Sequence, residues 1–285
     1  MPDSSRTTTV RMRRLAAELR NLRAGAGMSR EEVVERTGVN VATLYRIEHA
    51  RVRPQARTLQ ALLQAYGVDT NQASELLALS RESGQRGWLQ AYEAELPETY
   101  TTFIGYEDEA RSVWNYEPAV LPELLQTRHY AHEVIAAGMR GAALDEVEQR
   151  VQVRIARQAV LTRYNPVLLW AVVDEAALHR RVGGPAVMKD QLRHLIRTMA
   201  IPSVTLQVIS FEAGAHPGLP GSFAVIKFPG EQDLDVIFVG GMAGDQFLEA
   251  EPDIARYNRL FQQLGAAALS PDDSRKLIAA LAERT

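Results

Sequence analysis

The N-terminal part of the chain consists of short amphipathic segments separated by polar or glycine-containing turns. Its apolar residues recur three or four positions apart, as with Leu15, Leu19 and Leu22, and this spacing places side chains on one face of a helix. Ser29 and Glu32 form a capping-box signal at the start of the second segment. The pattern predicts five short helices. The first covers residues 10–25, the second lies between Ser29 and Gly38, and the third begins after Asn40. The fourth covers residues 59–66 and the fifth residues 72–79.

The second and third predicted helices are separated by a turn that contains Gly38. Two helices joined in this way are typical of a helix-turn-helix, in which the second of the pair enters the major groove of DNA. Leu44 and Ile47, three positions apart, take the buried side of that helix. Its groove-facing side is then formed by Val41, Ala42, Tyr45 and Arg46. A helical bundle that binds only protein is the alternative interpretation.

The residues of this surface differ in what they are able to recognise. Arg46 is the one residue on the groove-facing side able to bind guanine O6 and N7 in a bidentate manner, whereas Val41 and Ala42 offer apolar contact to a thymine methyl group. The residues expected to position phosphates, with backbone N–H groups at the helix starts, are Ser29, Arg30, Asn40 and Thr43. The arginines expected either to reach the DNA backbone or minor groove, or to be solvated surface residues, are Arg51, Arg53 and Arg57.

The segment Gly27–Glu48, GMSREEVVERTGVNVATLYRIE, resembles the phage-repressor-like helix-turn-helix family often called the xenobiotic-response-element type. The resemblance implies base contacts from Val41, Ala42 and Arg46. It also places Arg23 opposite Glu48 as a partly buried ion pair, which is costlier to break than a surface pair. Two residues depart from the family pattern. Arg30 replaces the usual glutamine at the start of the second helix, and Ala50 stands where a glycine usually takes a left-handed turn.

The pattern changes beyond residue 80. Residues 81–87 are polar and contain two glycines, which is typical of a linker. Beyond them, helices are predicted at residues 88–94, 106–116, 121–137, 145–164, 185–199, 252–268 and 274–284. Short apolar runs bounded by Pro, Gly and Asp predict strands at 167–173, 204–209, 222–228 and 235–239. We therefore expect a mainly α-helical chain with a small sheet: a five-helix helix-turn-helix domain over 1–80 and an α/β or α+β domain of about four strands over 88–285.

Several segments of this second domain resemble an actinobacterial family in which the same kind of helix-turn-helix precedes a domain of uncertain biochemical activity. The resemblance lies in YEDEAR at 106–111, LPELLQTRHYA at 121–131, RVQVRIARQ at 150–158, VDEAAL at 173–178, VGG at 182–184 and GAHPGLPGSF at 214–223. It implies a transcriptional regulator, often described as antitoxin-like and commonly paired with a small protein encoded by a neighbouring gene. Glu123 departs from the glycine usual at that position.

Composition narrows the class of protein. With 285 residues, of which 46% are hydrophobic and 24% charged, the chain is typical of a globular protein of two domains. It contains no cysteine, which excludes thiol nucleophiles, thiolate zinc sites and iron–sulfur clusters. Its longest apolar run, residues 167–173, is far shorter than the roughly 20 residues of a membrane helix. The first residues have no apolar stretch typical of a signal peptide, so we expect a cytoplasmic protein with no membrane partner.

The charge of the chain is distributed unevenly. Residues 1–70 contain twelve arginines against seven acidic residues, a net charge of +5, which leaves −8 for the other 215 residues. A basic segment attached to an acidic remainder favours a nucleic-acid-binding head on a body with another task. Arginine outnumbers lysine throughout the chain, and not only in the basic segment. The preference for arginine alone therefore indicates no binding site.

Few residues of the second domain suggest chemistry. Arg150, Arg154 and Arg157 recur at helical spacing and form either an anion or partner site or a solvated charged face. His216 lies in a Gly- and Pro-rich loop, where it either contacts a ligand or partner or has no such role. Asp174 and Glu175 either cap the following helix or form a catalytic acid pair. His129 and His132 are either surface residues or ligands of a metal ion. We expect no enzyme activity, no cofactor and no metal site.

Taken together, the sequence predicts a sequence-specific DNA-binding transcriptional regulator. Helix-turn-helix heads make few base contacts each, so we expect a homodimer that reads two half-sites of double-stranded DNA. The second domain would dimerise the chain and receive a signal from a ligand or a small partner protein. The alternative is an antitoxin-like interaction protein that mainly binds a small neighbouring protein and uses DNA binding for autoregulation.

Overall fold

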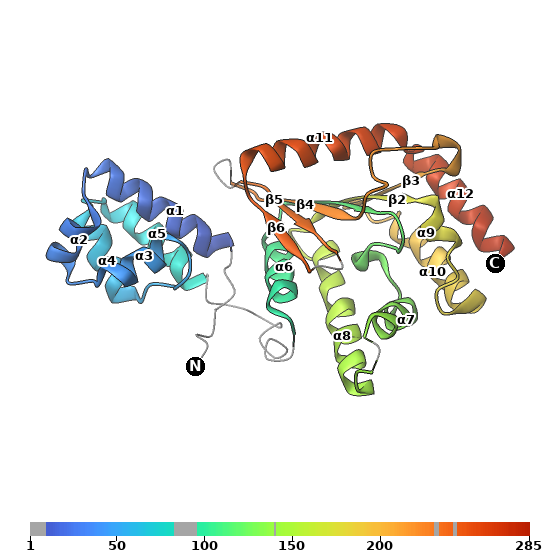
Figure 1. Ribbon diagram of the computed structural model, residues 1–285, viewed down its shortest axis with the longest axis horizontal. Helices are drawn as coiled ribbons and strands as arrows, with labels where there is room; N and C mark the ends of the chain where they lie inside the picture. Colours follow the sequence, from blue (N-terminus) through green and yellow to red (C-terminus); the bar gives the residue numbers. More distant parts are fainter. Residues whose placement is uncertain (1–9, 83–95, 140, 231–233, 242–243) are drawn as a thin grey trace. The chain divides into compact units, whose positions relative to one another are not determined.

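The structure is a computed structural model that describes residues 10–82, 96–139, 141–230, 234–241 and 244–285 (Figure 1). The chain divides into two compact units, Met1–Tyr106 and Glu107–Thr285. Residues 88–94, predicted to be helical, lie outside the described residues, as do residues 83–87 of the expected linker. No helix in the described part of the chain is long and apolar enough to cross a membrane.

The N-terminal unit contains the five predicted helices. They are α1 (Val10–Gly25), α2 (Arg30–Thr37), α3 (Val41–Glu48), α4 (Ala56–Ala65) and α5 (Thr70–Glu82). Ser29 caps α2 in a capping box with Glu32, and Gly38 ends α2 in the left-handed conformation at φ 72°. The inward faces of all five helices enclose one core, whose fully buried leucines include Leu19, Leu44, Leu59 and Leu62. The local signals in this segment therefore agree with its tertiary packing.

The C-terminal unit is built on a mixed six-stranded sheet of order β3-β2-β1-β4-β5-β6. Its strands are β1 (Ser112–Glu117), β2 (Leu168–Asp174), β3 (Val204–Ile209), β4 (Phe223–Lys227), β5 (Val236–Val239) and β6 (Gln246–Leu248). β1, β2 and β3 are parallel and joined through helices, whereas β4, β5 and β6 are antiparallel to their neighbours. This mixed sheet with helices confirms the expected α+β class.

Helices lie on both faces of this sheet (Figure 1). The helices that begin beyond residue 95 are α6 (Glu98–Glu109), α7 (Arg128–Gly138), α8 (Leu144–Arg157), α9 (Glu175–His179), α10 (Gly184–Thr198), α11 (Glu251–Ala267) and α12 (Pro271–Arg284). α11 packs Phe261 and Leu264 against Tyr116 of β1 and Val172 of β2. α7 and α8, on the other side in Figure 1, share a small apolar cluster around Ile135 and Val151.

The strand at the centre of the sheet is the main error of the sequence prediction. Residues 106–116 were expected to be one helix, but α6 ends at Glu109 and β1 begins at Ser112. Tyr106, Ala110 and Val113 lie three and four positions apart, so the helical spacing continues by coincidence into the strand. β6 also lacks a sequence signal, since it is only three residues long.

A second correction concerns residues 121–137, which were expected to form one helix. They instead form a short 3₁₀ turn, Glu123–Leu125, followed by α7. Thr127 starts α7 as its N-cap, because its hydroxyl accepts a hydrogen bond from the Tyr130 backbone N–H. The chain therefore changes direction at Gln126, whose side chain is buried.

Candidate nucleic-acid interface

α3 has the orientation that the sequence predicts. Leu44 and Ile47 are buried in the core of the N-terminal unit. On the opposite side, Val41 is 43% exposed and Tyr45 is 40% exposed, and Ala42 and Arg46 are exposed as well. The side chains predicted to face the major groove thus form one continuous exposed surface on a helix held by its other face.

Arg46 and the arginines that follow α3 are available to a ligand. Within the described residues, the side chains of Arg46, Arg53 and Arg57 make no hydrogen bond or ion pair, and all three are exposed. An unpaired, exposed guanidinium keeps all of its donors for bidentate recognition of guanine or for a phosphate. Thr43, also expected to contact phosphate, is half-buried.

Two of the residues expected to position phosphates have capping roles. The Ser29 hydroxyl accepts a hydrogen bond from the Glu32 backbone N–H at 3.2 Å, and the Glu32 carboxylate accepts one from the Ser29 N–H at 2.7 Å. The hydrogen bond from the Ser29 backbone N–H lowers the pKa of the Glu32 carboxyl group. The Asn40 side-chain oxygen accepts a hydrogen bond from the Ala42 N–H at 2.8 Å. Both caps fix the starts of α2 and α3, which the predicted backbone–phosphate contacts require.

Glu48 lies at the centre of a buried ionic cluster. Its carboxylate is fully buried and pairs with the Arg23 guanidinium at 2.5 Å, as the resemblance implied. The same carboxylate also pairs with Arg30 at 2.7 Å, and the Glu48 carbonyl accepts a hydrogen bond from Arg20. Hydrogen bonding to Glu48 raises the pKa of Arg23. The sequence suggested a phosphate contact for Arg30, whereas the structure engages its guanidinium with a residue at the end of α3.

Tyr45 is held in place by three neighbours on the exposed side of α3. Its ring stacks on His49 with centroids 3.9 Å apart, and the His49 Nδ1 lies 2.7 Å from the Tyr45 carbonyl. The guanidinium groups of Arg30 and Arg51 lie 5.4 and 5.8 Å from the centroid of the Tyr45 ring. The sequence analysis did not single out His49, because nothing in its local pattern distinguishes a ring-stacking histidine from a solvated one.

The turn after α3 keeps its geometry despite the substituted glycine. Ala50 adopts the left-handed conformation with φ 55°, the only non-glycine residue with positive φ among those described. Its methyl group is buried against Met12 and Ala16 of α1. Apolar burial therefore offsets part of the conformational cost of a Cβ in this region.

The arginines of α8 do not form the exposed row that their spacing suggested. Arg150 is half-buried, but Arg154 and Arg157 are buried. Arg157 pairs with Glu107 at 2.7 Å and also with Glu123, while Arg154 pairs with Glu123 at 2.5 Å. The alternative of a solvated charged face is therefore wrong for Arg154 and Arg157, because the acidic residues that neutralise them come from distant segments of the chain.

This buried cluster is also where carboxyl groups have shifted pKa values. Burial raises the pKa of Glu107, and the adjacent Arg157 opposes that rise. Burial raises the pKa of Glu117 to about 8, against a lowering effect of its hydrogen bond from the Asn115 amide. The Gln126 side chain joins the cluster by accepting a hydrogen bond from Arg154 at 3.0 Å. Glu123, the residue that departs from the family pattern, bridges both arginines.

His216 lies inside the C-terminal unit, not on the surface of its loop. Its Nε2 lies 3.0 Å from the Asp174 carboxylate, and its Nδ1 accepts a hydrogen bond from the Gly218 N–H at 3.3 Å. Gly218 in turn lies on the Tyr116 ring, where a Cβ would be 2.4 Å from Cζ. His216 therefore holds the loop onto the sheet. Asp174 also caps α9.

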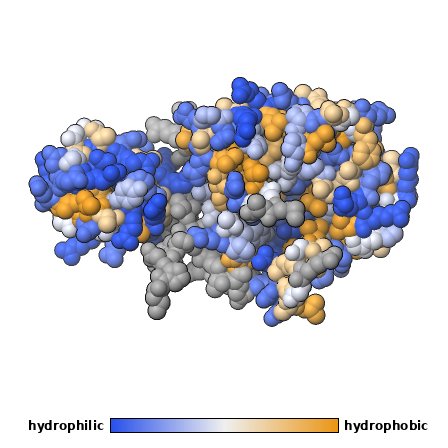
Figure 2. Space-filling view, in the orientation of Figure 1, coloured by the Kyte–Doolittle hydropathy of each residue, from blue (hydrophilic) through white to orange (hydrophobic). Residues whose placement is uncertain are grey.

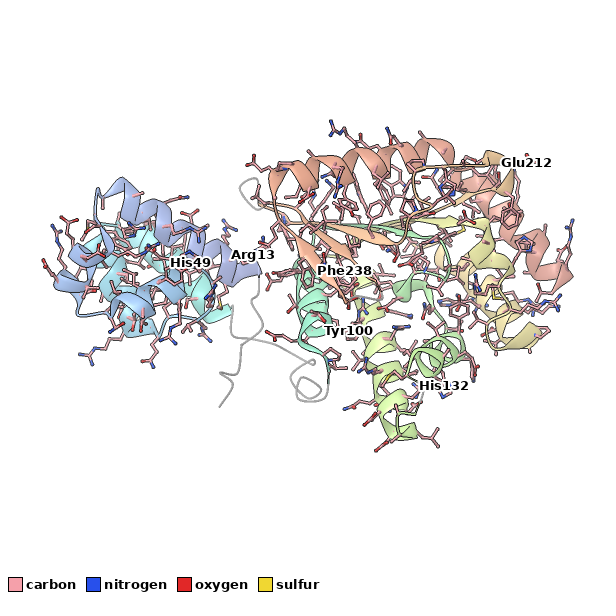
Figure 3. All side chains as sticks on the ribbon, viewed as in Figure 1. Arg13, His49, Tyr100, His132, Glu212 and Phe238 are labelled. Carbon is pink, nitrogen blue, oxygen red and sulfur yellow. The ribbon has the colours of Figure 1, made fainter. Side chains whose placement is uncertain are left out.

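Two further candidates from the sequence, the histidines of α7 and Glu175, lie apart from each other in their contacts. His132 lies on α7, as Figure 3 shows, with its Nδ1 3.6 Å from the Glu133 carboxylate. Among the described residues there is no group of three or more His, Asp or Glu side chains placed to hold a metal ion. The Glu175 carboxylate accepts a hydrogen bond from the Phe211 N–H at 2.8 Å, so it is engaged in fixing the following loop.

Comparison with known protein families agrees with this geometry. Residues 14–76 match a helix-turn-helix domain, so the N-terminal unit has the fold and exposed helix of DNA-binding regulators. Residues 100–280 match a domain of unknown function, DUF5753, over more than half of the chain, and the protein belongs to that family. No curated protein and no solved structure matches the chain significantly.

Proposed function

We propose that this protein is a sequence-specific DNA-binding transcriptional regulator that works as a homodimer. The observation that carries the proposal is the exposed face of α3, where Val41, Ala42 and Arg46 surround a fixed Tyr45. The helix-turn-helix domain and the net charge of +5 over residues 1–70 support the same assignment. A regulator of this kind acts where the chromosome is, which in a bacterium is the cytoplasm.

In this proposal each exposed residue of α3 has a distinct role. Arg46 donates two hydrogen bonds to guanine O6 and N7, and Val41 and Ala42 contact a thymine methyl group. Arg51 and Arg53, just beyond the helix, contact phosphates of the adjacent backbone. Tyr45 stays stacked on His49 and in contact with the guanidinium groups of Arg30 and Arg51, and it sets the direction in which these two charges point.

The proposal assigns two tasks to the C-terminal unit. It brings two helix-turn-helix domains together on a two-fold symmetric operator, and it receives a ligand or a small protein that changes their arrangement. A signal of either kind shifts the equilibrium only through different affinities for the two arrangements. We further propose that this unit has no catalytic role. The antitoxin-like alternative predicts instead that a small partner protein copurifies with the chain in a fixed ratio.

Selection of genomic DNA fragments by the purified protein tests DNA recognition directly. We expect enrichment of a short, roughly palindromic motif. Arg46→Ala should cost about 1–3 kcal/mol of specific binding and relax the preference at one base pair of each half-site. The matched control is Arg275→Ala, since Arg275 is an exposed arginine of α12 in the other unit.

Three outcomes decide between the hypotheses. Loss of affinity and of one base preference in Arg46→Ala, but not in Arg275→Ala, supports the proposed orientation of α3. Unchanged binding in Arg46→Ala contradicts it. No enriched motif at all, at a salt concentration where background binding is low, would reject sequence-specific recognition.

A further inference from the structure

A cavity of about 600 Å³ opens on the C-terminal unit at the amino-terminal ends of the parallel strands. Its volume is within the range of roughly 300–1,000 Å³ typical of small-molecule sites. The residues that shape it are Arg111, Trp114, Leu168, Trp170, Thr205 and Lys227. None of them takes part in the DNA-contacting surface or in the buried cluster of α8.

The floor of the cavity is aromatic because of the strand register. Trp114 of β1 pairs with Trp170 of β2, and Trp170 pairs with Thr205 of β3, so the three side chains form a row across one face of the sheet. The two indole rings meet edge to face with centroids 5.5 Å apart. Phe261 of α11 stacks on Trp114 with centroids 5.2 Å apart. Both tryptophans nevertheless remain only half-buried, so part of each indole faces the cavity.

The orientation of the floor is fixed by polar contacts below it. The Trp170 indole N–H donates a hydrogen bond to the Gln207 side chain at 2.7 Å. The Gln207 amide in turn donates to the carbonyl of Leu269 at 2.9 Å, beyond the end of α11. The indole therefore cannot rotate to cover the cavity without losing a hydrogen bond, and the aromatic surface is preformed.

Among the residues that the structure describes, the rim of the cavity carries excess positive charge. The Lys227 ammonium lies 4.0 Å from the centroid of the Trp114 ring, and it is paired with the Asp235 carboxylate at 2.8 Å. Arg111 is exposed, and its guanidinium has no hydrogen bond or ion pair within the described chain. The three described charged residues that line the cavity, Arg111, Lys227 and Asp235, thus leave one positive charge uncompensated among themselves, that of Arg111.

We propose that this cavity binds a planar aromatic anion, a carboxylate on a fused or extended ring system. The ring lies on the exposed part of Trp170, beside Trp114, and against Leu168, which is 48% exposed. The carboxylate pairs with Arg111 at the rim. A cationic ligand is disfavoured because the positive charges of Arg111 and Lys227 would repel it. This inference stands independently of the proposed DNA binding.

Isothermal titration calorimetry of the full-length protein with 2-naphthoate tests the proposal. The neutral control is 2-naphthamide, which has the same ring system and no charge. We expect saturable one-to-one binding of the carboxylate, and about fivefold weaker binding of the amide, because the rim pair is solvent-exposed. Arg111→Ala should bring the affinity for 2-naphthoate down to that for the amide.

Substitutions inside the cavity locate the binding site. Thr205→Trp places a large ring over the floor and should abolish binding of 2-naphthoate. Leu168→Glu puts a negative charge at an exposed position, so it should also abolish binding without disturbing the core. The matched control is Gln263→Trp, which fills a second cavity of about 460 Å³ beside α11 and should leave binding unchanged.

The expected pattern is loss of binding in Thr205→Trp and Leu168→Glu and retention in Gln263→Trp, with circular dichroism confirming the fold of each variant. Should Thr205→Trp fail to fold, Leu168→Glu decides the question alone. The proposal is overturned if 2-naphthoate gives no saturable heat, if it binds no more tightly than 2-naphthamide, or if Gln263→Trp is the variant that loses binding.

Discussion

Single residues of the N-terminal unit show how far local sequence signals determine this structure. The capping box of Ser29 and Glu32 and the buried positions of Leu44 and Ile47 follow from spacing alone, and the structure confirms them. Glu48 was assigned one partner, Arg23, from the family resemblance, but it has a second in Arg30. Nothing in the local pattern indicates that second pair, because Arg30 is 18 residues away and reaches Glu48 only through the packing of α2 on α3.

Removing the charge of Glu48 should destabilise the N-terminal unit. The Glu48→Gln variant leaves Arg23 and Arg30 without their buried carboxylate, and both guanidinium groups are partly accessible to water. We expect a loss of about 2 kcal/mol, less than the roughly 3–5 kcal/mol of a fully buried pair, because rehydration of the arginines offsets part of the cost. Hydrogen exchange of peptides from α1 to α5 measures this loss.

The control for this substitution is Glu31→Gln, since Glu31 is exposed on α2. A change at such a surface position is expected to stay within about 0.5 kcal/mol. Equal protection of the N-terminal helices in Glu48→Gln and in Glu31→Gln would mean that the buried cluster contributes specificity of packing and little stability.

At the scale of elements, the sequence predicts helices better than it predicts the sheet. Long amphipathic segments such as α10 have enough turns for their spacing to be unambiguous, and α8 was predicted too, although it ends at Arg157 and gives way to a 3₁₀ turn, Gln158–Leu161, before the predicted end at residue 164. β1, by contrast, continues the helical spacing of α6 by coincidence. The ion-pair partners of the α8 arginines could not be predicted from the sequence either, because Arg157 pairs with Glu107, which is 50 residues away. A row of arginines at helical spacing therefore does not by itself distinguish a surface from an interior.

The packing of α11 on the sheet depends on a glycine. A Cβ at Gly265 would lie 2.9 Å from Cζ2 of Trp170. Helix propensity favours alanine over glycine by about 1 kcal/mol, but overpacking a core contact costs about 1–3 kcal/mol. We therefore expect Gly265→Ala to be destabilising overall, because the Trp170 indole is held by Gln207 and cannot move away.

A second helical glycine provides the matched comparison for that substitution. Gly138 ends α7, and a Cβ there would meet nothing within 4 Å. Gly138→Ala should leave stability unchanged or raise it by up to about 1 kcal/mol. Urea unfolding followed by tryptophan fluorescence measures both variants. A stabilised Gly265→Ala would show that α11 is able to shift away from the sheet.

At the scale of the whole molecule, sequence and structure give complementary information. The division into a basic head and an acidic body follows from charge counting, whereas the two compact units of the structure are Met1–Tyr106 and Glu107–Thr285. The chemistry of the body did not follow from the sequence, because its aromatic cavity combines residues from four strands and the segments beside them. Such a site exists only once the register of the sheet is known.

The proposed homodimer makes a prediction about the two units. A fragment of residues 1–82 contains α1 to α5 and their common core, so we expect it to fold on its own. If the C-terminal unit holds two heads together, the fragment should keep the base preference of the full chain. It should lose about a hundredfold or more in affinity, because the second head no longer binds at a high effective concentration. Electrophoretic mobility shift with the selected operator measures this ratio.

Fusion of the same fragment to a dimeric coiled coil separates dimerisation from direct DNA contacts of the C-terminal unit. If the unit acts through dimerisation, the fusion should recover most of the lost affinity, provided that its linker spans the distance between half-sites. A fragment that binds as tightly as the full chain would contradict the assigned role, since each head would then suffice alone. Failure of the fusion to recover affinity would instead indicate that the C-terminal unit contacts the DNA, and its net charge of −8 beyond residue 70 argues against that outcome.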